Sequence, residues 1–117
     1  MQHDRIVFNY QREDDILYIA FGEEGRNGMG FNLYPNILLR FDRETGEPFG
    51  LTFIDYSQLK ALPAIPLADL SKLPENLAKI VRQILLSEPV SRFIAVNPRD
   101  FASFSVINPS MEKVIAA

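Results

Sequence analysis

The chain has 117 residues, 47% of them hydrophobic, a formal net charge of −3 and no cysteine. This length suits one domain with a modest core, and the apolar content argues against disorder. The missing cysteines exclude disulfides, thiolate nucleophiles and iron–sulfur clusters, and the acidic balance argues against a nucleic-acid partner.

The N-terminal residues lack the charged-then-apolar layout of a signal peptide, and no apolar run is long enough to cross a bilayer. We therefore expect a cytoplasmic protein without membrane association. The one histidine is His3, close to the N-terminus, which removes the usual general base at neutral pH and the commonest metal ligand. We expect no catalytic residues, no metal site and no cofactor.

The first half of the chain has the alternation of β-strands. Residues 5–10 read as a half-buried strand, and a polar turn at 11–15 follows. Residues 16–21 are apolar on both faces and predict a central strand that is buried on both sides. Residues 22–30 contain four glycines and predict a flexible loop or a bulged edge, after which 31–34 begin another strand.

A second hairpin is predicted around a turn at 42–47, where Asp42 can bond backbone amides and Gly46 can adopt a positive φ. Residues 37–41 alternate before the turn, with Leu38 and Arg40 facing away from their apolar neighbours. After the turn, 48–56 form a strand. Its predicted faces are Phe49, Leu51 and Phe53 on one side and Gly50, Thr52, Ile54 and Tyr56 on the other.

The second half changes to a helical pattern. A short helical turn is expected at 57–62, and prolines punctuate the connector that follows. An apolar stripe at helical spacing predicts an amphipathic helix at about 74–87; its members are Leu77, Ile80, Val81, Ile84 and Leu85. Apolar runs at 93–96 and 101–107 predict a hairpin that extends or faces the sheet, and 111–117 is a short last helix or a frayed end.

These patterns predict an α+β fold in a single domain spanning 1–117. Residues 5–56 form an antiparallel β-meander of about four strands. Residues 57–117 supply a connector, one main amphipathic helix packed on the sheet, and a C-terminal strand-like segment with possible additional strands.

Short motifs recur in both hairpins. In the first hairpin they contain Tyr10, Arg12, Glu13, Asp15, Leu17, Tyr18 and Ile19. In the second they contain Ile37 to Leu39, Asp42, Gly46, Gly50, Leu51, Ile54, Asp55 and Ser57. With these residues the chain resembles, over residues 6–60, a family of small bacterial domains of unknown function, family 2283 of that series. The chain departs from the pattern at Thr52, where that family often has an acid, and at Glu47-Pro48, which lengthens the turn. The resemblance implies a β-meander followed by a helix and implies no activity.

The candidate ligand-binding residues are Tyr18, Tyr34, Tyr56 and Asp55. The plainer interpretations are core packing for the tyrosines and, for Asp55, a helix-capping or a hydrogen-bonded strand-end carboxylate. The acidic residues of the 42–47 turn favour a plain hairpin turn over a calcium loop, because the loop is too short.

The favoured hypothesis for function is a non-catalytic interaction or regulatory module that acts through a sheet edge or an apolar face. Strands that are apolar on both faces need cover on both sides, so we expect a homodimer or another protein partner. The alternative is a small-molecule binder with a pocket between helix and sheet near loop 22–30. A remote alternative is an acid-based hydrolase that uses Asp55 with Glu23 or Glu24.

Overall fold

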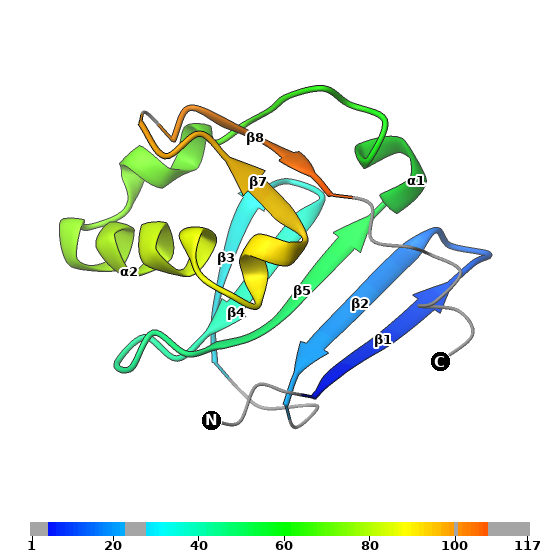
Figure 1. The fold of residues 1–117 in the computed structure, drawn as a ribbon, viewed down its shortest axis with the longest axis horizontal. Coiled ribbons are helices and arrows are strands. Elements are labelled where there is room, and N and C mark those ends of the chain that lie inside the picture. The colour runs from blue at the N-terminus through cyan, green and yellow to red at the C-terminus, as the bar shows by residue number, and fades with distance from the viewer. Residues whose placement is uncertain (1–4, 23–27, 100, 108–117) are drawn as a thin grey trace.

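The computed structural model describes residues 5–22, 28–99 and 101–107. The first half supplies the strands of a large sheet, and the second half supplies helices and a small sheet (Figure 1). In chain order the elements are β1 (Ile6–Gln11), β2 (Ile16–Phe21), β3 (Met29–Tyr34), β4 (Ile37–Phe41), β5 (Pro48–Ile54), α1 (Tyr56–Leu59), β6 (Ile65–Pro66), η1 (Ala68–Lys72), α2 (Glu75–Leu86), η2 (Val90–Arg92), β7 (Ile94–Val96) and β8 (Ser103–Val106).

Strands β1 to β5 form one antiparallel sheet in the order β1-β2-β5-β4-β3. The hairpin β1–β2 is joined to the meander β3–β4–β5 because β5 pairs with both β2 and β4. This arrangement and the single main helix confirm the predicted α+β class. The sheet has five strands where about four were expected, because 29–34 pair with β4 through a turn at Pro35 and Asn36.

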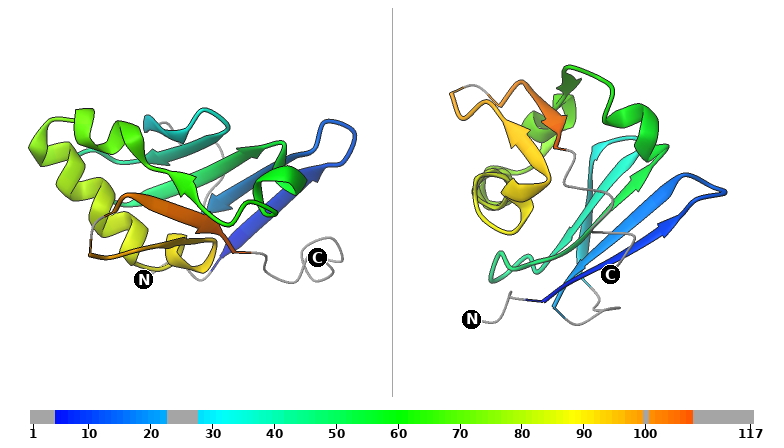
Figure 2. Two further views of the ribbon diagram at one scale, coloured as in Figure 1. Left: turned by 90° about the horizontal axis from the view of Figure 1, so that it is seen from above. Right: turned by 45° about the vertical axis from the view of Figure 1, so that its right-hand side comes forward.

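A second layer covers one face of this sheet (Figure 2). It contains α2 and the three-stranded sheet β6-β8-β7, in which the predicted hairpin of the two C-terminal apolar runs is confirmed as β7 paired with β8. The ring of Phe93 lies 5.8 Å from that of Phe8 in β1 and 6.2 Å from that of Phe21 in β2. Buried residues of both layers form one core cluster. We call the face under this layer the covered face and the opposite face the open face.

The predicted helix at about 74–87 is confirmed as α2. Its apolar stripe lies in the core, with Val81 and Leu85 almost fully buried. On the outer surface, Arg82 donates to the carboxylate of Glu75 at 2.9 Å. The short helical turn expected at 57–62 is α1, which begins one residue earlier and ends three residues earlier, at Leu59. It begins earlier because Asp55 in a left-handed conformation redirects the chain at the end of β5.

The turn between β4 and β5 has the predicted chemistry. Asp42 Oδ1 accepts hydrogen bonds from the backbone amides of Glu44 at 2.8 Å and Thr45 at 3.1 Å. Gly46 has a φ of 79°, a conformation that costs glycine little. These bonds are those of a hairpin turn, which is the interpretation that the sequence favoured over a calcium loop.

The faces of β5 differ from the prediction at two residues. The register shifts so that Arg40 lies opposite Gly50 while Phe41 lies opposite Pro48, which leaves Phe49 as an extra residue in a β-bulge. Phe49 therefore lines the open face and does not join the core. Tyr56 lies in the core, 1% exposed, because the chain has already turned at the end of the strand.

Several residues discussed above lie outside the described ranges: His3, Glu23, Glu24 and 111–117. Among the helices of the described residues, none has the length and apolar character needed to cross a membrane.

Candidate functional site

The open face is built from the outward side chains of β1, β2, β5 and β4, which the strand register aligns in rows. One row runs from Val7 through Ala20 and Gly50 to Arg40. The next row runs from Asn9 through Tyr18 and Thr52 to Leu38 on the same strands. Because the first row contains residues with little or no side chain at its centre, the face is lower there than along the second row.

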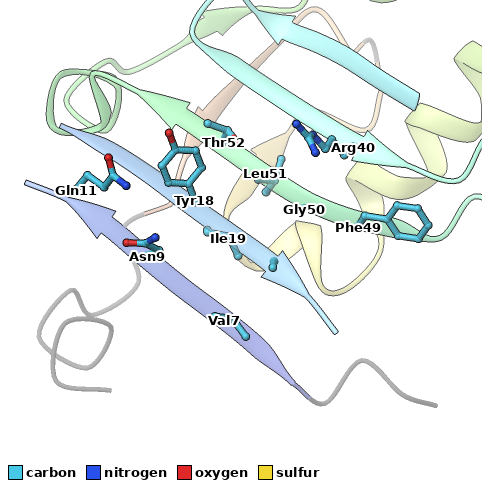
Figure 3. Close-up of a pocket in the computed structure, with 11 residues that line it drawn as sticks. Val7, Asn9, Gln11, Tyr18, Ile19, Arg40, Phe49, Gly50, Leu51 and Thr52 are labelled. Atoms are coloured by element: carbon cyan, nitrogen blue, oxygen red, sulfur yellow. The ribbon is translucent and has the colours of Figure 1, made fainter. Parts of the chain in front are cut away.

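A hollow of about 350 Å³ occupies this part of the open face (Figure 3). We call it the open-face hollow; it is lined by Val7, Asn9, Gln11, Tyr18, Ile19, Ala20, Arg40, Phe49, Gly50, Leu51 and Thr52. A Cβ at Gly50 would lie 2.7 Å from the carbonyl oxygen of Ile19, so the close approach of β2 to β5 requires glycine here. The hollow is thus a consequence of how the two central strands pair.

Arg40 is the one charged residue among those that line the open-face hollow. Figure 3 shows its guanidinium directed from β4 toward β5, with Phe49 and Tyr18 on different sides of the hollow. No ion pair of Arg40 occurs among the residues that the structure describes. The hollow therefore combines one accessible cation, two aromatic rings and the neutral amides of Asn9 and Gln11.

The two edges of the five-stranded sheet differ. Both edge strands are uncharged, and among the described residues β1 pairs only with β2, in a regular register, and β3 only with β4. β3, at the other edge, has an irregular register at Asn32 to Tyr34 and lies against η1. A flat, uncharged edge strand is open to pairing with another strand, whereas a bulged and covered edge is not.

Three residues of the family resemblance, Tyr10, Asp15 and Ser57, meet at one end of the sheet. Asp15 accepts a hydrogen bond from the Tyr10 hydroxyl at 2.7 Å and one from the Ser57 hydroxyl at 2.6 Å. The Ser57 amide lies 3.2 Å from both carboxylate oxygens. This carboxylate thereby joins the β1–β2 turn to the first turn of α1, which is a structural role for the motif.

The ionisation of this cluster is consistent with that role. Burial of Asp15 acts to raise the pKa of its carboxyl, but hydrogen bonds from Ser57 and Tyr10 and the nearby charge of Lys60 together lower it below the ordinary value. The pKa of Tyr10 is raised, chiefly by its hydrogen bond to Asp15. Burial, followed by the effect of Tyr10, raises the pKa of Tyr56.

The structure does not bring the four candidate ligand-binding residues together. Tyr18 lines the open-face hollow at 39% exposure, whereas Tyr34 packs against the core. Tyr56 is a core residue whose hydroxyl has no hydrogen-bond partner in the described structure. Asp55 accepts a hydrogen bond from Asn36 Nδ2 at 3.2 Å, so it is a hydrogen-bonded strand-end carboxylate.

Two further depressions lie away from the open face. One is between α2 and the β4–β5 turn, lined by Gly46, Ile80 and neighbours, and the other is beside Gly28 and Asp42. The first is lined by α2 but by no residue of loop 22–30, and the second is lined by Gly28 and Met29 but by no helix residue. The pocket expected between helix and sheet near this loop stays a prediction, because residues 23–27 are not described. Among the described residues, no group of three His, Cys, Asp or Glu side chains could hold a metal ion.

Sequence reasoning missed most of the open-face hollow. Arg40 was assigned to the outward face of its strand, but nothing in the order of residues placed it beside Tyr18, which is two strands away. Phe49 was assigned to the same face as Leu51 and Phe53, because a bulge cannot be predicted from alternation alone. The combination of Pro48 and Gly50 around it is the only local indication of an irregular strand.

Comparisons with protein-family models, with curated proteins and with solved structures gave no match to this chain. The resemblance to domain family 2283 therefore stays a prediction that depends on the residues quoted for it.

Proposed function

We propose that this protein is a non-catalytic interaction module that pairs with a partner strand along the β1 edge, and that the partner is a second copy of the chain. The observation that supports this most directly is the contrast between the two edges of the five-stranded sheet. Both edge strands are uncharged, but β1 has a regular register and pairs only with β2 among the described residues, while β3 has an irregular register and lies against η1.

The backbone of β1 has hydrogen-bonding groups on its outer side. The amide of Gly22 donates to the carbonyl of Arg5 at 2.8 Å, which fixes the phase of the β1–β2 ladder. Since bonded and non-bonded pairs alternate in an antiparallel ladder, Val7 and Asn9 bond to β2, and the N–H and C=O groups of Ile6, Phe8 and Tyr10 point to the free edge. These groups match a partner strand.

A second copy of β1 fits this edge with two-fold symmetry. When Phe8 lies opposite Phe8 of the other copy, Ile6 lies opposite Tyr10, and roughly six backbone hydrogen bonds form. Arg5 then lies opposite Gln11, so no like charges meet. The product is a continuous ten-stranded sheet, which removes one exposed edge from each copy.

The mass in solution tests this proposal. Light scattering at micromolar concentration is expected to give twice the chain mass of 13.3 kDa. Asn9→Lys is expected to shift the mass toward one chain, because in the symmetric pair the two introduced ammonium groups are diagonal neighbours. The matched control is Asn32→Lys, the same exposed residue type on the β3 edge, which is expected to leave the mass unchanged. A wild-type mass of one chain would refute the proposal.

A further inference from the structure

We propose that the open-face hollow is a binding site for a small planar aromatic carboxylate, with Arg40 receiving the carboxylate. This site is a separate proposal from the pairing of the β1 edge, and its test does not depend on the oligomeric state. The argument uses the shape of the hollow, its charge and the spacing of its polar groups.

The shape suits a flat ring. Ala20 and Gly50, which are paired across β2 and β5, form a floor without long side chains. The rings of Tyr18 and Phe49 border it (Figure 3). Aromatic side chains favour offset or edge contacts with a planar ligand. The volume of about 350 Å³ is at the small end of the range for ligand sites. A bicyclic ring system fits that size, while a bulky or branched molecule would meet the Tyr18 and Thr52 row.

The charge of the hollow selects an anion. The guanidinium of Arg40 is the one charged group among the lining residues, and it has no ion pair among the described residues. A guanidinium binds a carboxylate with two parallel hydrogen bonds, and this geometry is unavailable to a ring without an acid.

The far end of the hollow adds a second polar requirement. Arg40 is on β4, and the amides of Asn9 and Gln11 are on β1, three strand spacings away. Neighbouring strands are about 4.8 Å apart, so these ends are about 14 Å apart at the backbone and closer at their side-chain tips. A ligand with the carboxylate at one end and a hydroxyl at the other matches this span, because an amide can donate to or accept from a hydroxyl.

The same charge pattern argues against two hollows stacking on each other. A face-to-face pair of copies would bring two Arg40 side chains into one buried interface, and the lining residues offer no carboxylate to either. Burial of unpaired charges is unfavourable. The hollow therefore suits an acidic ligand better than it suits a second copy, which leaves the β1 edge for self-association.

The test is a titration of the full chain with a hydroxynaphthoate, followed by amide chemical shifts in two-dimensional NMR. The expected result is shifts at Tyr18, Gly50 and Thr52 that saturate with the probe. The matched hydroxynaphthamide, which lacks the charge, is expected to bind roughly tenfold more weakly. Equal affinity for the two probes, or no shifts with either of them, would overturn the proposal.

Three variants complete the test. Arg40→Gln is expected to weaken binding of the naphthoate roughly tenfold and to leave the naphthamide unaffected. Arg92→Gln, a change of the same type on η2 away from the hollow, is expected to have no effect. Ala20→Leu fills the floor and is expected to abolish binding of both probes, with core shifts showing that the variant is folded. Unchanged naphthoate binding by Arg40→Gln or by a folded Ala20→Leu protein would refute the assignment.

Discussion

On the covered face of the five-stranded sheet, Leu17 and Phe21 are at most 1% exposed, whereas Tyr18 between them on the open face is 39% exposed. The strand is apolar on both sides, so the difference arises from what lies over each face. Among the described residues, the second half of the chain covers one face of the sheet. The covered face therefore contributes the buried side chains of the core, whereas no described element lies over the open face or pairs with the outer side of β1.

The largest difference in the free energy of unfolding is expected when an aromatic residue on each face of β2 is replaced by alanine. Phe21→Ala removes a ring that stacks on Phe93 in the core and is expected to lower the free energy of unfolding by about 3–5 kcal/mol. Tyr18→Ala, on the open face, is expected to cost less than about 1 kcal/mol. Urea denaturation of both variants checks the comparison, and equal losses would contradict it.

A smaller loss is expected at the end of the sheet, where Asp15 connects the covered face to α1. Asp15→Asn weakens the hydrogen bonds that the carboxylate accepts from Tyr10 and Ser57 and is expected to cost about 1.5–3 kcal/mol. Asp14→Asn, the adjacent exposed residue of the same turn, serves as the control and is expected to change little. A loss in the control as large as that for Asp15 would show that the turn itself, and not this carboxylate, is responsible.

The same carboxylate predicts a pH dependence. The pKa of Asp15 is lower in the folded chain than its ordinary value. Its contribution is therefore complete above the unfolded pKa of about 3.9 and is lost as the pH falls through the folded pKa. The stability difference between wild type and Asp15→Asn should shrink between about pH 5 and pH 2. A difference that stays constant over this range in urea titrations would contradict the assigned pKa direction.

On the open face, two glycines differ in what an added Cβ would meet, which is backbone at Gly50 and a side-chain end at Gly30. Gly50→Ala places a Cβ 2.7 Å from the carbonyl oxygen of Ile19, a backbone atom that cannot move away easily, and is expected to cost about 1–3 kcal/mol. Gly30→Ala meets only the flexible end of Leu38 at 3.3 Å and is expected to change stability by less than about 0.5 kcal/mol. Thermal unfolding of the pair tests this. If the two changes cost the same, close strand packing does not explain the hollow.

The smallest predicted effect is an increase in the free energy of unfolding. Tyr56→Phe removes a buried hydroxyl that has no hydrogen-bond partner in the described structure, and it is expected to stabilise the fold by up to about 1 kcal/mol. Tyr10→Phe removes a hydroxyl that donates to Asp15 and is expected to destabilise by about 1–2 kcal/mol. The changes in the free energy of unfolding, measured by urea denaturation, should therefore have opposite signs. A loss of stability in Tyr56→Phe would mean that the hydroxyl of Tyr56 has a hydrogen-bond partner in solution.

Local sequence patterns predicted most of the fold, because helices and tight turns depend on residues that are close together in the chain. The stripe from Leu77 to Leu85 defines α2, and Asp42 with Gly46 defines the β4–β5 turn. Other features depend on contacts between distant residues. Sheet pairing determines the position of β5 beside β2 and the bulge at Phe49, and the chain changes direction at Asp55, before Tyr56. Alternation of residue types alone does not predict these features.

The candidate site was harder to predict for the same reason. Tyr18 was singled out from the sequence, but its neighbours in the hollow come from three other strands. The other two tyrosines, Tyr34 and Tyr56, were named on residue type, and their positions against or within the core agree with the packing interpretation. Residue type indicates what a side chain can do, while the pairing of strands decides which side chains meet.

The most direct test of the account is amide hydrogen exchange along β1 at high and low protein concentration. The amides of Val7, Asn9 and Gln11 should be protected at both concentrations, because they bond to β2. The amides of Ile6, Phe8 and Tyr10 should be protected only at high concentration, when a second copy of β1 bonds to them. If these three amides exchange as fast as exposed ones at high concentration, β1 does not pair and the proposed interaction surface is wrong.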